Sequence, residues 1–528
     1  MSISLPRRTH RLILLSIVLL ALFRGGLYAT YLPPWGLIDE EHHFHYIQHL
    51  AEQRTIPIVG KTYLSPEIIE SLFATRRWEM FHWPTPDSPD PRAMGLEGHS
   101  YEGYQPPLLY ILLVPLYQVL PVDVLTKLYC LRGAMVALSL LTIWLTYRTA
   151  TVLFPQRRAL PYFLCCFLVI IPERTAAVSR INNDVLLEVI ATAFIWVCTD
   201  AIMHGLSIRQ SQTLGVVFGL GMWTKMSMIV LVIMLPFVFW ANRRSKNLKV
   251  YALWIGGIAI AMIAPLFARN LRLYGDLTGF ASFRELNEVF GVIAKIRFTT
   301  QNLFVAVRQL FCHMWVVWWK GARAAHPPLL NGLCILWALL SSLSLATVLI
   351  HLLSKWRSRN WGRYEQVLSM YLFAIGSYAV AVLVSYFDGR VPVIQGRFLL
   401  PVIMPLVILF VWGLSGNSSN KTPLLVSLGT LIIADTMSFF GNLLPYFYYW
   451  SAFVRNGSLQ PHRRPGWQQA SDLFLTRLLS DKPPGMRPIL ICVLTLYAAS
   501  LVFAGIMSTK ALSFDNRHFN VLNDIQRE

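Results

Sequence analysis

The chain has 528 residues, of which 55% are hydrophobic and only 14% are charged. Soluble domains carry about 25% charged residues, so the composition excludes a soluble globular protein and predicts an all-α polytopic membrane protein. The formal net charge of +19 would suggest a nucleic-acid partner in a soluble protein, but the positive-inside bias of membrane loops produces the same excess. We therefore expect the lipid bilayer, and no nucleic acid, as a partner.

The first apolar run covers residues 12–31 and follows the basic segment 6–11. A signal peptide begins in the same way, but this run is long and no clear cleavage motif follows it, so we expect a retained first span with its basic flank inside. Residues 32–126 then form a long outer segment. Within it, 106–121 is apolar but short and bounded by prolines, which predicts a re-entrant or interfacial segment.

The remaining apolar runs bring the expected number of transmembrane helices to about twelve. They lie at about 127–147, 159–172, 184–203, 211–223, 226–241, 250–268, 331–353, 366–386, 398–414, 423–441 and 489–508. If 106–121 does not span, the basic clusters at 148–158, 243–246 and 355–363 all fall on the inner side. The positive-inside rule favours this orientation.

The seven cysteines provide no evidence for cross-links. Most of them lie within apolar runs, and none forms a C-x-x-C spacing. This pattern predicts no disulfide framework, so we interpret the cysteines as small residues embedded in the membrane.

Polar side chains gather near the outer ends of the predicted spans. Asp39 and Glu40 follow the first span, and Glu102 and Gln105 precede the re-entrant segment. Later outer ends carry Arg132, Arg180, Asn183, Asp184, Lys225, Arg269 and Arg397. A carboxylate can take a proton from an acceptor, and arginine and lysine can hold a phosphate. Acids in the first loop and bases in later ones therefore suit an anionic lipid-linked donor and a neutral acceptor.

A series of short motifs runs in order from about residue 30 to 405. It consists of Asp39-Glu40-x-x-His43-Phe44, Gln105-Pro106-Pro107-Leu108-Leu109-Tyr110, Arg132, Asn182-Asn183-Asp184, Arg269-Asn270-x-x-x-Tyr274-Gly275-Asp276 and Gln395-Gly396-Arg397-Phe398-Leu399-x-Pro401. This series resembles the GT-C membrane glycosyltransferases, a superfamily that includes protein O-mannosyltransferases and lipid A aminoarabinose transferases. The resemblance implies a GT-C-like bundle with a long first extracytoplasmic loop.

The resemblance also implies an activity. Members of the superfamily transfer a sugar from a polyprenyl-phosphate donor to an extracytoplasmic acceptor (glycan, lipid or protein) with inversion, and many need no metal. Carried over by position, Asp39 would be the catalytic base, supported by Glu40. The donor phosphate would be held by Arg132, Lys225, Arg269 and Arg397. The substrate site would be supported by His43, Glu102, Gln105, Asn183 and Asp184.

The domain organisation and the location follow from the same resemblance. Residues 1–441 would form the GT-C-like catalytic module, with outer loops at 32–126 and 269–330. Residues 442–528 would add an outer loop, a final span and a cytoplasmic tail. We expect a multi-pass protein of a bacterial inner or plasma membrane, with its active site on the extracytoplasmic side.

Several of these residues also have simpler interpretations. Asp39 and Glu40 could cap an interfacial helix, since acids favour helix N-termini. Residues 182–184 could cap the next span, and Arg132 could snorkel to the interface. Lys225 could be an ordinary turn residue.

The histidines that crowd the acids leave metal dependence open. His42 and His45 are three residues apart, and His45 and His49 are four apart, so each pair would share a face of a helix. A divalent metal is therefore a possible cofactor, although no cofactor is certain from the sequence.

A transporter or flippase of lipid-linked saccharides is the alternative function. It would use the same basic groups to carry a phosphate and would need no catalytic base. Transporters often contain inverted repeats and helices broken near the membrane midplane. The sequence shows no internal repeat, and its polar groups lie at span ends, so we favour the enzyme.

Overall fold

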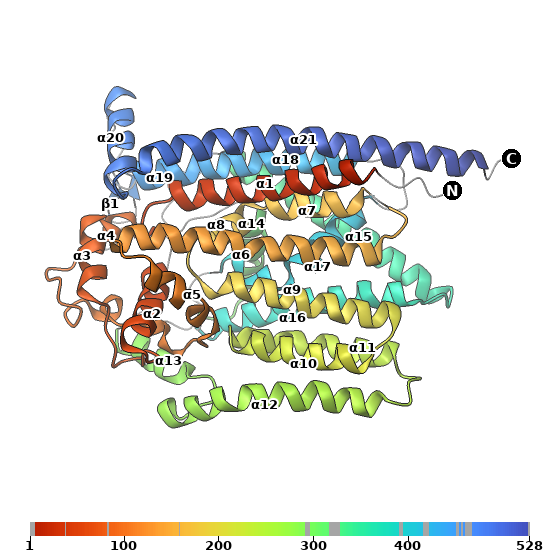
Figure 1. Cartoon of the computed structure of the whole chain (residues 1–528), viewed down its shortest axis with the longest axis horizontal. Helices are drawn as coiled ribbons and strands as arrows, with labels where there is room; N and C mark the ends of the chain where they lie inside the picture. Colours follow the sequence, from red (N-terminus) through yellow and green to blue (C-terminus); the bar gives the residue numbers. More distant parts are fainter. Residues whose placement is uncertain are drawn as a thin grey trace.

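The computed structural model describes the chain except residues 1–5, 37–38, 82–83, 158, 291–295, 316–327, 390–393, 416–421, 450–453, 456–457, 460–466 and 526–528. The described part is almost wholly helical, and its long helices run side by side along the long axis of the molecule (Figure 1). Two short strands, β1 (Val454–Arg455) and β2 (Ser458–Leu459), pair antiparallel. The predicted all-α polytopic architecture is confirmed.

Three groups of helices build the molecule. The main helices of the nine candidate membrane spans among the described residues are α1 (Arg7–Tyr31), α6 (Val124–Leu153), α9 (Asn183–His204), α12 (Leu248–Tyr274), α15 (Pro328–Arg357), α16 (Arg363–Phe387), α17 (Ile403–Ser415), α18 (Thr422–Ser438) and α21 (Met486–Ile525). Shorter segments between them are α7 (Leu160–Ile170), α8 (Pro172–Val178), α10 (Ile208–Met222), η3 (Met226–Met234), α11 (Leu235–Ala241), α14 (Thr300–Trp315), η5 (Gly396–Val402), the π-helix η6 (Phe439–Leu443) and α19 (Leu444–Tyr448). The loop helices are α2 (Glu40–Gln53), α3 (Pro66–Ala74), α4 (Arg77–Phe81), η1 (Gly95–Gly98), η2 (Tyr101–Tyr104), α5 (Leu108–Val119), α13 (Phe280–Val289) and α20 (Trp467–Ser480).

The loop helices mark one end of the bundle. In Figure 1, α2, α3, α4, α13 and α20 gather at the left end, whereas α1 begins and α21 ends at the right. Contacts at the other end join Arg157 to Ser415 and Arg363 to the carbonyl of Met203. Basic residues predicted to lie inside the cell are thus separated from the first-loop helices by the length of the bundle.

Fewer of the described helices are long and apolar enough to span a membrane than the sequence predicts. Nine of the described helices, some of them composite, are long and apolar enough to cross a membrane, and the pair α7–α8, bent by 67°, would make a tenth. Each predicted span coincides with a helix or a helix pair, but α10 has only 15 residues. The count of about twelve therefore stays a prediction. Helix α5 has 12 residues, too few to span, as expected for a re-entrant or interfacial segment.

A buried ion pair stabilises the break between α7 and α8. Pro172 begins α8, and a proline removes a backbone donor, so carbonyls near the break need other partners. Arg24 of α1 donates to the carbonyl of Ile170 at 2.9 Å and also to that of Val169. Its Nε donates to the Asp435 carboxylate of α18 at 2.9 Å. The carbonyls at the break are thus bonded to Arg24 of α1, and the charge of Arg24 is balanced by Asp435 of α18.

A disulfide between Cys312 and Cys334 links α14 to α15, with the two Cα atoms 5.4 Å apart. The expectation that no cysteine is cross-linked is wrong for this pair. The two residues are 22 positions apart in the sequence, and such a distant pairing has no local spacing signal.

A separate hydrophobic core fastens the first loop to the bundle. Phe44 and Ile47 of α2 are fully buried, and they belong to one cluster with Leu109 of α5 and Leu131 of α6. Burial of a large apolar side chain is worth about 1.5–3 kcal/mol, so α2 sits on a well-packed support. Its first turn is therefore held in a defined position.

Candidate active site

Asp39 lies immediately before α2 in the left-handed backbone conformation, with φ 71°, which aspartate adopts more readily than most residues. The Tyr101 hydroxyl donates a 2.7 Å hydrogen bond to its Oδ1, and Nη2 of Arg397 lies 3.6 Å from its Oδ2. The side chain is 22% exposed and makes no capping hydrogen bond within the described part of the chain. The carboxylate therefore faces a cation and remains reachable, which the capping interpretation does not explain.

Arg397 reaches Asp39 because η5 approaches the end of α14 closely. A Cβ atom at Gly396 would lie 2.5 Å from the backbone nitrogen of Met314, so only glycine permits this approach. Nη1 of Arg397 lies 3.8 Å from Oδ2 of Asp184, and its buried Nε has no hydrogen-bond partner among the described residues. The guanidinium faces two carboxylates at distances longer than direct hydrogen bonds, so its donors are available to a ligand.

The start of α9 brings four of the predicted site residues together. Asn182 caps the helix by accepting a 2.9 Å hydrogen bond from the backbone nitrogen of Asp184, as expected for a helix cap. Nζ of Lys225 donates to Asp184 at 2.5 Å. The Asn183 amide donates to Oε1 of Gln105 at 3.0 Å. Motifs that are far apart in the sequence therefore meet at one end of the bundle.

Arg180, in the turn before α9, is a member of the site that the sequence did not single out for phosphate binding. It is buried, and its Nε has no hydrogen-bond partner in the part of the chain that the structure describes. Burial is the main cause that lowers the pKa of Arg180 to about 10, and the charge of Arg397 lowers it further. Two neighbouring guanidinium groups repel each other, so a bound anion would stabilise both. The sequence signal was an arginine in the polar segment between two predicted spans.

Two neutral groups complete the surroundings of Asp39. Burial, followed by the negative charge of Asp39, raises the pKa of Glu102 to about 8, so this carboxyl is mostly protonated at pH 7. Burial lowers the pKa of His43 to about 3, so the imidazole is neutral. Its Nδ1 lies 2.8 Å from the Tyr110 hydroxyl of α5. Both side chains lie within electrostatic reach of Asp39, where the sequence predicted supporting residues.

Glu40 and Arg132 form a separate and closed ion pair. Nε and Nη2 of Arg132 donate to the two carboxylate oxygens of Glu40 at 2.8 and 2.5 Å. Its other donors bind three backbone carbonyls in segment 29–33. All the donors of a guanidinium are thus engaged, and both side chains are fully buried. This geometry argues against the phosphate role predicted for Arg132 and against the alternative that Arg132 snorkels to the interface. The pair instead ties the end of α1 to the start of α2.

Arg269 lies at the flank of the site. Its Nη1 donates to Asn270 at 3.1 Å, and its guanidinium lies 5.7 Å from the centre of the Tyr274 ring. The Tyr274 hydroxyl donates to the Gly103 carbonyl at 3.4 Å. No contact among the described residues joins Arg269 to Asp39, so its phosphate role stays a prediction.

The histidines of α2 point to different partners. Nδ1 of His45 lies 2.9 Å from the Ser100 hydroxyl, and Nε2 of His49 lies 3.1 Å from the Thr55 hydroxyl. The His42 ring packs against another residue, Tyr101, at an interplanar angle of 34° and with ring centroids 3.8 Å apart. A joint metal site of these three histidines is therefore not formed in the described structure.

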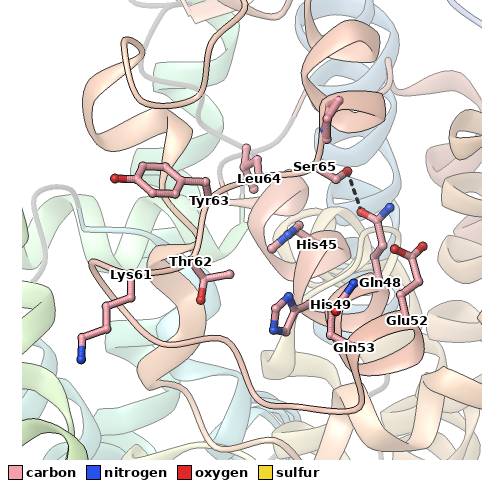
Figure 2. Close-up of a pocket in the computed structure, with 11 residues that line it drawn as sticks. His45, Gln48, His49, Glu52, Gln53, Lys61, Thr62, Tyr63, Leu64 and Ser65 are labelled. Atoms are coloured by element: carbon pink, nitrogen blue, oxygen red, sulfur yellow. Dashed lines mark hydrogen bonds between the residues drawn. The ribbon is translucent and has the colours of Figure 1, made fainter.

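A polar cavity of about 440 Å³ lies along the far half of α2. Its lining residues are His45, Gln48, His49, Glu52, Gln53, Lys61, Thr62, Tyr63, Leu64, Ser65 and Pro66. Figure 2 shows the segment 61–65 passing beside α2, with the Ser65 hydroxyl donating to Gln48 at 2.8 Å.

Comparison with known proteins supports the class of protein that these contacts suggest. Residues 126–268 match the family described as dolichyl-phosphate-mannose-protein mannosyltransferase. The matched segment runs from the start of α6 into α12 and carries Arg180, Asp184 and Lys225. The match confirms the resemblance to GT-C membrane glycosyltransferases that the motifs predicted.

Comparison with solved structures finds similarity to two proteins, in each case with a TM-score below 0.5. ArnT from Cupriavidus metallidurans bound to undecaprenyl phosphate is 14% identical, with a TM-score of 0.49 over 97% of this chain and 78% of that one. Its apo state gives a TM-score of 0.46 at the same identity and coverage. The Archaeoglobus fulgidus oligosaccharyltransferase in complex with Zn and sulfate is 12% identical, with a TM-score of 0.38 over 86% of this chain and 57% of that one. Likenesses at this level say nothing about individual site residues. No curated protein sequence matches this chain significantly.

Proposed function

We propose that this chain is an integral-membrane glycosyltransferase that takes a sugar from a polyprenyl-phosphate donor and transfers it to an extracytoplasmic acceptor. The observation that carries the proposal is the reachable carboxylate of Asp39 beside the partly unpaired guanidinium of Arg397. Arg180 and Lys225 add further positive charge next to this pair. A base for a proton and cations for a phosphate are the two groups that this chemistry needs.

In the proposed reaction, a hydroxyl or amine of the acceptor attacks the anomeric carbon of the donor sugar. Asp39 takes the proton of the attacking group. The bond between the anomeric carbon and the phosphate oxygen breaks, and polyprenyl phosphate leaves with the bonding electron pair. A single displacement of this kind inverts the anomeric centre. Arg397 and Arg180 stabilise the charge that gathers on the leaving phosphate.

The family match supports this donor class, because the matching family is described by a sugar linked to a lipid phosphate. The intramembrane charges are also better explained without transport. Arg24 and Asp435 are paired with each other, as are Arg174 and Glu188, so these charges in the candidate spans have fixed structural partners.

The test is release of polyprenyl phosphate from a panel of polyprenyl-phosphate sugars by the purified full chain in lipid nanodiscs. The Asp39→Asn variant should bind donor but turn it over at least about 100-fold more slowly, the contribution expected of a general base. Arg180→Met should weaken donor binding by about 10- to 100-fold, since a hydrogen bond to a charged group is worth roughly 1.5–3 kcal/mol.

The matched control is Arg284→Met, which removes an exposed arginine that pairs with Glu288 on α13 and should change neither quantity. Wild-type turnover in Asp39→Asn would refute the mechanism. Movement of an unaltered donor across a proteoliposome membrane, without release of polyprenyl phosphate, would instead identify a transporter.

A further inference from the structure

A second cluster of ionisable side chains lies where α2 meets η1. Glu41 and His42 come from the first turn of α2, and Glu97 comes from η1. Each offers one carboxylate oxygen or ring nitrogen, and the three atoms lie within 4.8 Å of one another. Nε2 of His42 lies 3.7 Å from Oε1 of Glu41. The proposed sugar transfer uses none of these three side chains.

His42 is the unusual member of the cluster. Its ring is fully buried, yet neither ring nitrogen has a hydrogen-bond partner in the described structure. The backbone of His99 interacts with the ring electrostatically without meeting the geometry of a hydrogen bond. Oε2 of Glu41 is also buried without a partner among the described residues. Nearly all buried polar atoms in proteins are paired, so several unpaired ligand atoms at one point indicate a ligand.

The charges around the cluster leave room for a cation. Nε of Arg77 donates to Oε1 of Glu41 at 3.0 Å, and its Nη2 lies 3.9 Å from Glu97. One guanidinium thus faces two carboxylates, so a negative charge remains when both are ionised. Arg77 is bonded to Oε1 of Glu41, whereas Oε2 has no hydrogen-bond partner among the described residues.

We propose that Glu41, His42 and Glu97 bind one divalent transition-metal ion, with Zn²⁺ preferred. A mixed set of imidazole and carboxylate donors is typical of zinc, which binds both at about 2.0–2.2 Å. In tetrahedral geometry the ligand atoms would lie about 3.4 Å apart, a spacing that follows from these bond lengths. The carboxylate of Glu97 is 26% exposed and is the side chain with the freedom to close the remaining gap. Water would occupy the fourth position.

The metal would act on the active site through one intermediate side chain. The His42 ring packs against Tyr101, and the Tyr101 hydroxyl donates to Asp39. An ion that fixes His42 therefore fixes Tyr101 and the orientation of the Asp39 carboxylate, while it stays out of contact with the sugar. The three ligands are positioning residues, and this consequence rests on the proposed function, whereas the metal site itself does not.

The test is a zinc titration of the full chain in nanodiscs after removal of bound metal by a chelator, with a chromophoric zinc indicator as competitor. Wild type should bind one Zn²⁺ per chain, confirmed by elemental analysis, and Glu97→Gln and His42→Ala should lose this binding. His49→Ala removes a histidine from the same helix outside the cluster and should bind like wild type. Thermal unfolding identifies any variant that fails to fold. If His42→Ala fails to fold, Glu97→Gln still tests the site, because position 97 is partly exposed.

Two results would overturn the metal site. One is a folded wild type that binds no zinc in the titration. The other is stoichiometric zinc in any folded variant of the cluster, Glu97→Gln or His42→Ala, because the ion would then be bound elsewhere. Neither result depends on sugar transfer, so failure of the metal site and failure of the proposed function are distinguishable. If the ion positions Asp39, its removal should lower the turnover number and leave donor binding unchanged.

Discussion

The pair of Glu40 and Arg132 gives a sharp test, because the sequence predicts that replacing Arg132 weakens donor binding, whereas the structure predicts that it lowers the free energy of unfolding. Both side chains are fully buried. Removing one partner of a buried ion pair costs about 3–5 kcal/mol, since the other charge is left without compensation. Arg132→Met also removes donors from three backbone carbonyls in segment 29–33, and each buried unpaired acceptor costs about 1–3 kcal/mol. We therefore expect Arg132→Met to be more destabilising than Glu40→Gln.

The assay combines unfolding with donor binding. Unfolding of the single variants and of Glu40→Gln/Arg132→Met in nanodiscs forms a double-mutant cycle. The double variant should lose less free energy of unfolding than the sum of the two single variants, by about 1–3 kcal/mol as expected for contacting residues. The folded fraction of each variant should bind the donor with nearly the same affinity as wild type. An Arg132→Met variant that unfolds like wild type but no longer binds donor would refute this reasoning and restore the phosphate role for Arg132.

Three further predictions concern the bundle, the pH response and the geometry of the site. Asp435→Ala should lower the free energy of unfolding by about 3–5 kcal/mol, because it leaves Arg24 buried with an unpaired charge; an unchanged unfolding curve would contradict this. As the pH rises through about 8, Glu102 ionises beside Asp39, so a phosphodiester donor should bind less tightly in a binding titration, and Glu102→Gln should lack this loss. Gly396→Ala should reduce the turnover of donor, because the added Cβ would displace η5 from Met314; wild-type turnover would show that η5 has room to move.

The bundle helices could be predicted from the sequence because apolar length is a local property. The runs at 12–31 and 127–147 fall inside α1 and α6, and the prolines around 106–121 indicated the short helix α5. The bend between α7 and α8 could not be predicted, because it depends on Arg24 and Asp435, which lie far from it in the sequence. The Cys312–Cys334 disulfide was missed for the same reason.

The candidate site could likewise be predicted only in part from the sequence. The sequence identified Asp39 and Arg397, and the structure places them 3.6 Å apart. Arg132 and Arg180 are both arginines near span ends, and the family resemblance assigned only Arg132 to the donor phosphate. Only three-dimensional contacts show that the first is saturated by Glu40 and backbone carbonyls, whereas the second keeps a buried nitrogen without a hydrogen-bond partner in the described part of the chain.

The most direct test of the account is a single-turnover measurement of polyprenyl phosphate release by wild type and by Asp39→Asn, with donor affinity measured on the same samples. The account predicts that the variant binds the donor at least as tightly as wild type, since a negative charge beside Arg397 is removed, and releases polyprenyl phosphate at least about 100-fold more slowly. Equal rates of release in the two proteins would contradict the assignment of Asp39 as the catalytic base.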